Sequence, residues 1–195
     1  MKYNDSIFMK IIRPIITLLF KIIYNPTIIG KENIPKEEKI ILAGNHTNNL
    51  DCLLLISSVK RNIHFLAKDE LWKGPKKIIF NNLGLIKVNR RKKDKECLIN
   101  AINYLKNEKV IGIFPEGTIG KKKLLPFKIG TVKMAYETNS EIIPFVITGK
   151  YKILFNNLKI EFCKPIKIKN NDLTKENENL RNIIIKMVGD NDEYI

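Results

Sequence analysis

The first apolar stretch, residues 7–24, is interrupted by polar residues at a helical spacing. They recur at intervals of four, three, four and four positions: Ser6, Lys10, Arg13, Thr17 and Lys21. On a helix this spacing gathers them into one narrow stripe and leaves a wide apolar face. The longest uncharged run, 14–20, is shorter than the roughly 20 residues that cross a bilayer. The stretch therefore predicts a helix at a membrane interface, and the alternative is a helix packed on the protein's own core.

Beyond residue 25, short apolar runs alternate with stretches of helical periodicity. The runs expected to form buried strands are 39–44, 64–68, 85–88, 110–114, 142–148 and 159–163. Helices are expected after Asp51, which is placed to act as an N-cap, and over 94–107, 130–138 and the acidic C-terminal tail. This alternation predicts an α/β fold with a mainly parallel sheet flanked by helices. We expect an interfacial helical segment at 1–25 and a single α/β domain at 26–195.

The chain of 195 residues has a formal net charge of +15, and its basic residues concentrate in the middle. Residues 60–95 hold 12 basic and 3 acidic side chains. Such a field attracts phosphates on nucleic acid, anionic lipid or a phosphorylated small molecule. RNA-binding surfaces interleave exposed aromatic residues with basic ones, but here Phe65, Trp72 and Phe80 stand in apolar settings. A non-enzymatic module binding RNA or anionic membrane is therefore the less favoured alternative, and we expect no nucleic acid partner.

The three cysteines are far apart in the sequence, and the chain has two histidines. No pair of cysteines has the spacing of a zinc site, so we expect neither a metal nor another cofactor. Free thiols fit a reducing compartment, which indicates the cytosol.

Residues 45–51, Asn-His-Thr-Asn-Asn-Leu-Asp, directly follow an expected strand and are called the histidine segment below. Histidine is a natural general base at neutral pH when a carboxylate holds its ring. Asp51 lies five residues after His46, close enough for a turn to bring the two side chains together. The same spacing is met by a helix-capping aspartate beside a loop histidine. These residues alone leave both interpretations open.

Residues 114–118, Phe-Pro-Glu-Gly-Thr, follow another expected strand and are called the FPEGT segment. They place a carboxylate, a flexible backbone amide and a hydroxyl at the edge where α/β folds carry their sites. Proline and glycine are also common in simple turns, which is the plainer interpretation. Glu116 favours a functional role because a carboxylate beside so apolar a strand needs partners.

Together these segments resemble the glycerolipid acyltransferase family typified by 1-acylglycerol-3-phosphate acyltransferase. That family has four sequence blocks in order, and the chain matches each of them within about residues 40–150. The matches are Asn45-His46 with Asp51, Gly84 and Arg90 in GLIKVNRR, FPEGT with the later PFKIG at 126–130, and Pro144 in IIPFVI. Four ordered blocks are more specific than any single one, and they favour the catalytic interpretation of the histidine segment.

The resemblance implies transfer of an acyl group from a thioester to the free hydroxyl of 1-acylglycerol-3-phosphate, giving phosphatidic acid. His46 would be the general base and Asp51 its orienting carboxylate, without an acyl-enzyme. A nucleophilic Cys52 assisted by His46 is the alternative. The residues implied in substrate binding are Arg90, Glu116, Gly117, Thr118 and Lys128.

The resemblance also implies partners and location. The donor would be acyl-CoA or an acylated acyl carrier protein, a co-substrate rather than a cofactor, which makes acyl carrier protein an expected partner. A lysophospholipid acceptor and an anionic membrane surface are the others, with the protein peripheral on the cytoplasmic face of the cell membrane. Ile119 stands where the family commonly has arginine, and Asn89 where an acidic residue is frequent. Another lysophospholipid is therefore an alternative acceptor.

Overall fold

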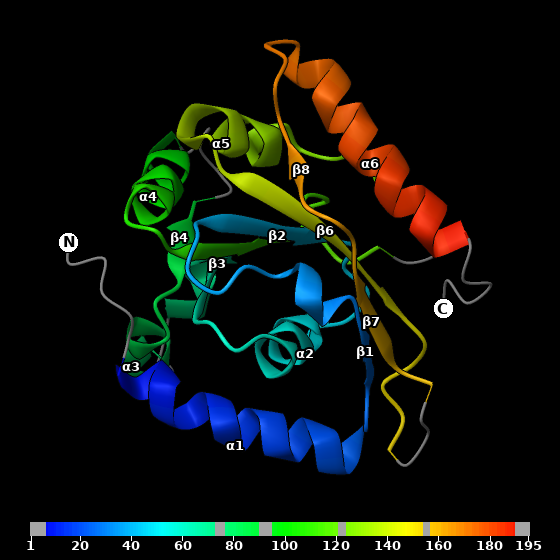
Figure 1. Cartoon of the computed structure of the whole chain (residues 1–195). Helices are drawn as coiled ribbons and strands as arrows, with labels where there is room; N and C mark the ends of the chain where they lie inside the picture. The colour runs from blue at the N-terminus through cyan, green and yellow to red at the C-terminus, as the bar shows by residue number, and fades with distance from the viewer. Residues whose placement is uncertain (1–6, 73–76, 90–94, 121–123, 154–156, 190–195) are drawn as a thin grey trace.

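The computed structural model describes residues 7–72, 77–89, 95–120, 124–153 and 157–189 (Figure 1). Its strands are β1 (Thr27–Ile29), β2 (Ile40–Gly44), β3 (Ile63–Lys68), β4 (Ile86–Val88), β5 (Val110–Ile113), β6 (Glu141–Thr148), β7 (Lys159–Phe162) and β8 (Ile166–Lys167). Its helices are α1 (Ile7–Ile23), α2 (Asp51–Ser58), α3 (Lys77–Asn82), α4 (Lys95–Lys106), α5 (Gly130–Thr138) and α6 (Leu173–Gly189). Single turns of 3₁₀ helix lie at Lys31–Asn33 and Asp69–Trp72.

Within the described residues the eight strands form one sheet in the order β1-β7-β6-β2-β5-β3-β4, with β8 beside β6. From β6 through β2, β5 and β3 to β4 all neighbours are parallel, and β1 is parallel to β7. Strands β7 and β8 each run antiparallel to β6. The mainly parallel sheet predicted from the sequence is confirmed. Strands β1 and β8, which are three and two residues long, were not predicted from the sequence.

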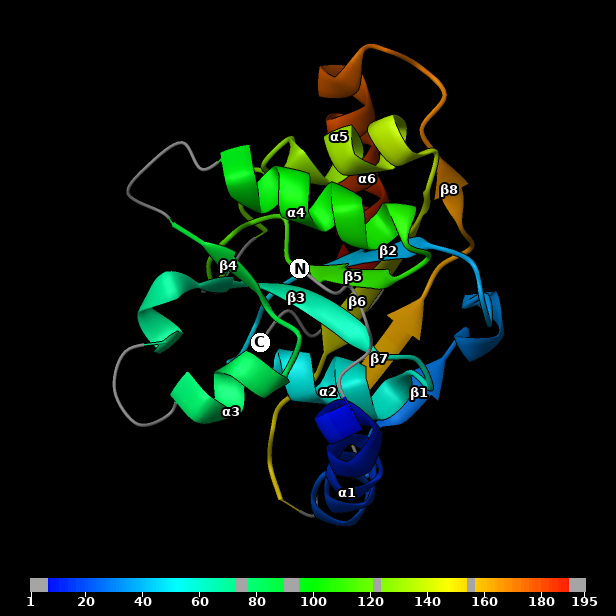
Figure 2. The same ribbon diagram turned by 90° about the vertical axis from the view of Figure 1, so that its left-hand side faces the viewer.

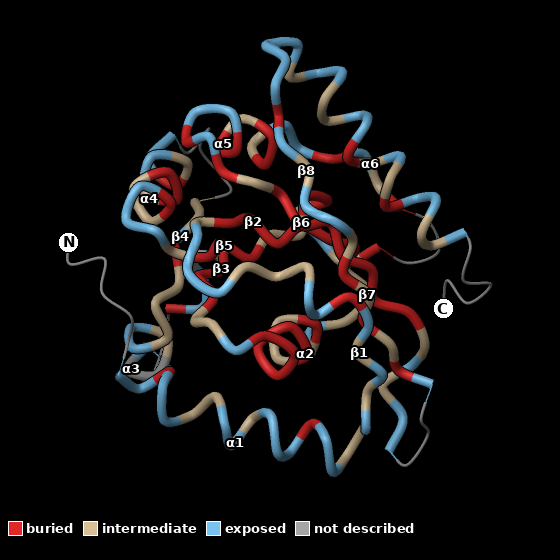
Figure 3. Tube along the Cα trace, viewed as in Figure 1, coloured by how far each residue is buried: buried red, intermediate tan, exposed pale blue. Residues whose placement is uncertain are grey.

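Helices cover both faces of the sheet (Figures 1 and 2). Helices α1 and α2 lie on one face, and α4, α5 and α6 lie on the other. Each side has an apolar core of its own, with Leu54 and Phe145 in the first and Ile111 and Met134 in the second. Strand β2 is buried along its whole length (Figure 3), which explains its uninterrupted apolar sequence.

Helix α1 packs on α2 and differs in burial between its two sides (Figure 3). Met9 and Phe20 are buried in the core, whereas Ile11 is 62% and Ile22 64% exposed. The helix therefore does pack on the protein's own core, and it also presents an apolar face outward; its contact with a membrane stays a prediction. Among the described helices, none is long and apolar enough to cross a membrane.

Candidate active site

Three neighbouring strands bring distant segments to one edge of the sheet. Strand β2 ends at Gly44, β5 at Ile113 and β6 at Thr148, and β2 is the parallel neighbour of both others. Their carboxyl ends therefore point to the same side, where α/β folds bind ligands. The histidine segment follows β2, the FPEGT segment follows β5, and Tyr151 follows β6. The two segments predicted from the sequence thus meet in space.

Asp51 is fully buried and is hydrogen-bonded through both carboxylate oxygens. Oδ2 lies 2.8 Å from Nδ1 of His46 and accepts from the backbone amides of Thr47 and Asn48 over 2.6 and 2.9 Å. Oδ1 accepts from the Thr47 hydroxyl over 3.2 Å and from the Tyr151 phenol over 2.6 Å. A buried carboxylate without such donors would be strongly destabilising. The loop therefore provides Asp51 with the partners that its burial requires.

Asp51 is not the helix N-cap that the sequence predicted. It is the first residue of α2, and the capping position belongs to Leu50, which makes no side-chain cap bond. The carboxylate turns back to the loop before the helix and accepts from the amides of Thr47 and Asn48. The N-cap prediction is wrong because the loop folds around the carboxylate, and amides of this loop donate hydrogen bonds to it.

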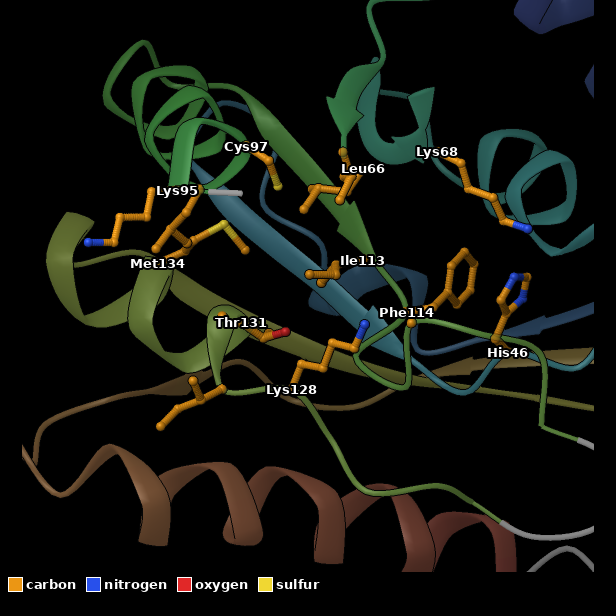
Figure 4. Close-up of a pocket in the computed structure, with 15 residues that line it drawn as sticks. His46, Leu66, Lys68, Lys95, Cys97, Ile113, Phe114, Lys128, Thr131 and Met134 are labelled. Atoms are coloured by element: carbon orange, nitrogen blue, oxygen red, sulfur yellow. The ribbon is translucent and has the colours of Figure 1, made fainter. Parts of the chain in front are cut away.

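The imidazole of His46 is fixed on two sides. Its ring stacks on that of Phe114, with centroids 4.2 Å apart and planes at 14° (Figure 4). A carboxylate only accepts hydrogen bonds, so Nδ1 carries the proton of the neutral ring and Nε2 carries the lone pair. His46 lines a cavity, and its side chain is 17% exposed. The arrangement holds the ring in one tautomer with an accepting nitrogen.

Asn45 extends the pairing between β2 and β6 beyond the end of β2. Its side-chain amide donates to the carbonyl of Ile147 over 2.8 Å, and its carbonyl oxygen accepts from the Ile147 amide over 2.7 Å. The side chain is fully buried. The sequence singles out Asn45 only as part of the first block, because its partner is 102 residues away and no local signal points to that partner. Asn45 fixes the start of the histidine segment to the sheet.

Glu116 joins the FPEGT segment to the histidine segment. Its buried carboxylate accepts from the backbone amides of His46 and Leu125 over 3.0 and 2.9 Å. Burial raises the pKa of Glu116, and the two amide bonds offset part of that rise. The described residues that line the cavity do not include Glu116. The expected substrate-binding carboxylate is thus placed where it supports the loop of His46.

The other residues expected to bind substrate lie in different surroundings. Gly117 and Lys128 line the cavity. Gly117 has a φ of 71°, and a Cβ added there would be 2.6 Å from the Lys128 ammonium nitrogen, so the ammonium lies directly over its backbone. Thr118 is exposed and is not among the described lining residues. Arg90 lies outside the described residues.

A cavity of about 600 Å³ opens beside His46 (Figure 4). Its apolar wall includes Leu66, Val88, Leu98, Ile113, Phe114 and Met134. Three ammonium-bearing side chains, Lys68, Lys95 and Lys128, also line it. Binding sites for small molecules typically combine such an apolar wall with a few charged groups. This cavity suits a ligand that is partly apolar and partly anionic.

Cys52 does not have the properties of an activated nucleophile. Burial raises the pKa of its thiol to about 12, and the charge of Asp51 contributes to the rise. Since the thiolate is the nucleophilic form, very little of it is present at neutral pH. Its side chain packs against the apolar core on the α1 and α2 side of the sheet. In the part of the chain that the structure describes, no group of three or more His, Cys, Asp or Glu residues could hold a metal ion.

The sequence of the chain matches the model of a known protein family. The acyltransferase family model matches residues 25–148, well over half of the chain. The chain belongs to the acyltransferase family. The matched residues run from β1 to the end of β6 and contain both the histidine segment and the FPEGT segment.

Individual acyltransferases are similar to this chain in sequence or in fold. A 1-acyl-sn-glycerol-3-phosphate acyltransferase of Borreliella burgdorferi is 34% identical over 66% of this chain and 53% of that protein. One of Helicobacter pylori is 33% identical over 62% of this chain and 52% of that protein. The chain thus spans about half the length of these curated relatives. The crystal structure of the acyltransferase PlsC from Thermotoga maritima shares the fold, with a TM-score of 0.76, 23% identity, and coverage of 93% of this chain and 78% of that one.

Proposed function

We propose that this chain transfers an acyl group from a thioester to the free hydroxyl of 1-acylglycerol-3-phosphate, giving phosphatidic acid. The observation that carries the proposal is the His46–Asp51 pair, 2.8 Å apart, at the wall of a largely apolar cavity. The similar proteins of Borreliella burgdorferi and Helicobacter pylori are named 1-acyl-sn-glycerol-3-phosphate acyltransferases, which supports this acceptor. Acyl-CoA and acylated acyl carrier protein are the proposed donors.

In the proposed reaction, Nε2 of His46 accepts the proton of the acceptor hydroxyl as its oxygen attacks the thioester carbonyl carbon. The tetrahedral intermediate then collapses, the C–S bond breaks, and the imidazolium returns the proton to the leaving thiolate. The products are an ester and a free thiol. Asp51 stabilises the imidazolium and keeps the ring in one tautomer. The acyl group never passes through Cys52, in agreement with the high pKa of that thiol.

The cavity supports binding of both parts of an acylated glycerophosphate. Apolar walls favour an acyl chain, since each buried methylene group contributes about 0.8 kcal/mol. Ammonium groups favour the phosphate. Lys128 lies over Gly117, close in sequence to Ile119, the position where the family commonly has arginine. We therefore assign to Lys128 part of the positive charge that this arginine would supply, and we retain Arg90 as a proposed phosphate ligand.

Helix α1 is the proposed contact with the membrane that contains the acceptor. Its exposed large apolar side chains are Ile7, Phe8, Ile11, Ile15, Leu18, Leu19 and Ile22. At 100° per residue these positions fall on one side of the helix, away from the buried Met9 and Phe20. A contiguous exposed apolar face indicates contact with lipid or with another protein. We propose lipid because the acceptor is a lipid and because Lys10 and Lys21 border one edge of the face, as in interfacial helices.

A basic depression adjoins the first half of α1 and lies at the amino ends of β2, β3 and β5, opposite the edge that carries His46. Its lining cations are Lys10, Arg13, Lys36, Lys60, Arg61 and Lys109, with Glu37 and Glu108 as the acids. Arg61 is engaged with the backbone carbonyls of Pro35 and Glu38. The excess of positive charge fits the anionic head groups of the proposed membrane.

Transfer to a panel of acceptors tests this proposal. The full chain is given a labelled acyl group, either as acyl-CoA or on acyl carrier protein. The acceptor is lysophosphatidate, glycerol 3-phosphate or lysophosphatidylcholine in mixed micelles. We expect labelled phosphatidic acid from lysophosphatidate at least ~10-fold faster than product from the other acceptors. If another lysophospholipid reacts faster, that lipid is the acceptor in place of lysophosphatidate. Absence of transfer from both donors, combined with tight RNA binding at physiological salt, would refute the enzymatic proposal.

A further inference from the structure

Asp51 is held from two sides by segments that are far apart in the sequence. Within the described residues, the donors of its own loop are His46, Thr47 and Asn48. The phenol of Tyr151 donates to Oδ1 over 2.6 Å from a position 100 residues later. The carboxylate therefore lies between the loop after β2 and the segment after β6, and Tyr151 makes the second attachment.

Backbone geometry and aromatic packing place Tyr151. Gly149 has a φ of 80°, and a Cβ there would lie 1.8 Å from the carbonyl oxygen of Asn157, so only glycine fits the turn that leads to Tyr151. The ring of Tyr24, just after α1, meets the ring of Tyr151 edge-on, with centroids 5.6 Å apart and planes at 85°. Tyr24 packs in turn on the buried Phe20, 5.2 Å away. Tyr151 is thus fixed by neighbours independent of Asp51.

Tyr151 remains a hydrogen-bond donor throughout the pH range in which histidines titrate. Burial raises the pKa of its phenol, and the negative charge of Asp51 raises it further. A donor that bonds a carboxylate stabilises the negative charge and weakens its attraction for a proton or a cation. The phenol therefore acts on His46 through its partner, Asp51.

We propose that Tyr151 is a positioning residue of the His46–Asp51 pair, which holds Asp51 towards the imidazole and limits how strongly the carboxylate stabilises the imidazolium. The role of Tyr151 in catalysis rests on the proposed function, whereas its hydrogen bond to Asp51 can be tested without measuring activity. None of the four sequence blocks contains Tyr151, so this residue is an addition from the structure to the set expected from the sequence.

Several other charged and titratable groups lie near the pair. Cys52 and Tyr24 interact with Tyr151, Glu116 interacts with His46 and Arg181, and Lys68, Lys95 and Lys128 line the same cavity. A variant that lacks only the phenol oxygen keeps all of these charges. A change in the titration of His46 in that variant therefore reports the lost hydrogen bond.

Tyr151→Phe in the full chain removes the hydroxyl and keeps the ring. The chain has two histidines, so NMR can follow the His46 ring, and the His46→Ala spectrum distinguishes it from His64. We expect the His46 titration midpoint and the acid limb of kcat/KM to move to higher pH by about half a unit. We expect kcat to fall about three- to tenfold, with KM within about a factor of two. Tyr136→Phe, which alters an exposed tyrosine of α5, is the matched control and should move neither quantity.

An unchanged midpoint together with a superposable pH profile would overturn the inference, even if kcat were lower. Incorporation of 3-fluorotyrosine, a stronger acid and therefore a stronger donor, supplies a second measurement without a substitution. It should move the His46 midpoint to lower pH in the wild-type chain but not in Tyr151→Phe, and the absence of that difference would also overturn the inference. A wild-type protein that is inactive but shows the expected NMR shifts would refute the proposed function and support the hydrogen bond.

Discussion

Asn45, Asp51 and Glu116 are buried polar side chains, and each bonds backbone groups of the segments around His46. Buried polar groups must be paired, and here the pairing also fixes the loops. Asn45 ties the histidine segment to β6, Glu116 ties it to the FPEGT segment, and Asp51 shapes it from within. His46 is left with an accepting nitrogen, so the chemistry is concentrated on one ring that its neighbours hold still.

The pairing of Asn45 predicts a large loss of stability on truncation. In Asn45→Ala the buried amide and carbonyl of Ile147 lose their partners, and we expect the free energy of unfolding to fall by about 2–4 kcal/mol. Urea unfolding followed by circular dichroism measures this. Asn107→Ala is the control, because the Asn107 side chain makes an exposed hydrogen bond to the carbonyl of Asn103. We expect this substitution to lower the free energy of unfolding by less than about 0.5 kcal/mol. Equal losses in the two variants would contradict the role of Asn45.

At the scale of elements, the strands that sequence patterns predict well are those buried on both faces. The apolar runs at 39–44 and 142–148 correspond to β2 and β6, which lie side by side under helices on both faces. Strand β1 was missed because its three residues alternate between exposed and half-buried, and β8 has only two residues. Such short edge strands carry too few apolar positions for a periodic signal, and their pairing decides their structure.

Helix α1 shows why one amphipathic pattern fitted two interpretations. The polar stripe that contains Lys10 and Lys21 separates a buried side, with Met9 and Phe20, from an exposed apolar side. Its sequence gives an apolar face wider than one contact requires, and the structure shows that α2 covers part of it. The remainder is the surface that we propose for lipid.

The exposed side of α1 can be altered without touching the core. We expect Ile11→Ser, Leu18→Ser and Ile22→Ser together to reduce binding to anionic liposomes at least ~10-fold, because three exposed apolar side chains no longer enter the interface. Flotation or sedimentation with vesicles measures the binding. The control carries Ile99→Ser, Ile153→Ser and Ile185→Ser, three exposed apolar residues outside α1. Unchanged binding of the α1 variant, or an equal loss in the control, would contradict the proposed membrane face.

At the scale of the whole molecule, the site exists because the order of strands in the sheet differs from their order in the chain. Strand β2 lies between β6 and β5, so segments about 70 and 100 residues from His46 become its neighbours. The sequence predicted the His46–Asp51 pair because both residues belong to one loop and because the four ordered blocks favour the catalytic interpretation of that loop. It could not predict the partners of Asn45, the bond from Tyr151 or the backbone partners of Glu116, because these depend on strand order. The substrate contact of Glu116 stays a prediction.

Glu116 also links the stability of the fold to pH. Burial raises the pKa of the Glu116 carboxyl in the folded protein above its ordinary value of 4.5. Because folding favours the protonated carboxyl, its contribution to stability is fully present below pH 4.5 and is lost as the pH rises through the folded-state pKa. Glu116→Gln does not ionise and lacks this dependence. We expect the free energy of unfolding of the wild type, minus that of the variant, to decrease between about pH 4 and pH 8. Urea unfolding at a series of pH values would contradict the raised pKa if this difference stayed constant or grew.

The most direct test of the central claim is the rate of acyl transfer by His46→Ala. Labelled acyl thioester and lysophosphatidate are supplied to wild type, His46→Ala and Asp51→Asn, and phosphatidic acid is measured after circular dichroism has confirmed that each variant is folded. We predict a loss of at least ~100-fold in His46→Ala, because general-base assistance disappears, and a smaller loss in Asp51→Asn, which keeps the base but lacks the charge that stabilises the imidazolium. Undiminished transfer by a folded His46→Ala protein would contradict the account.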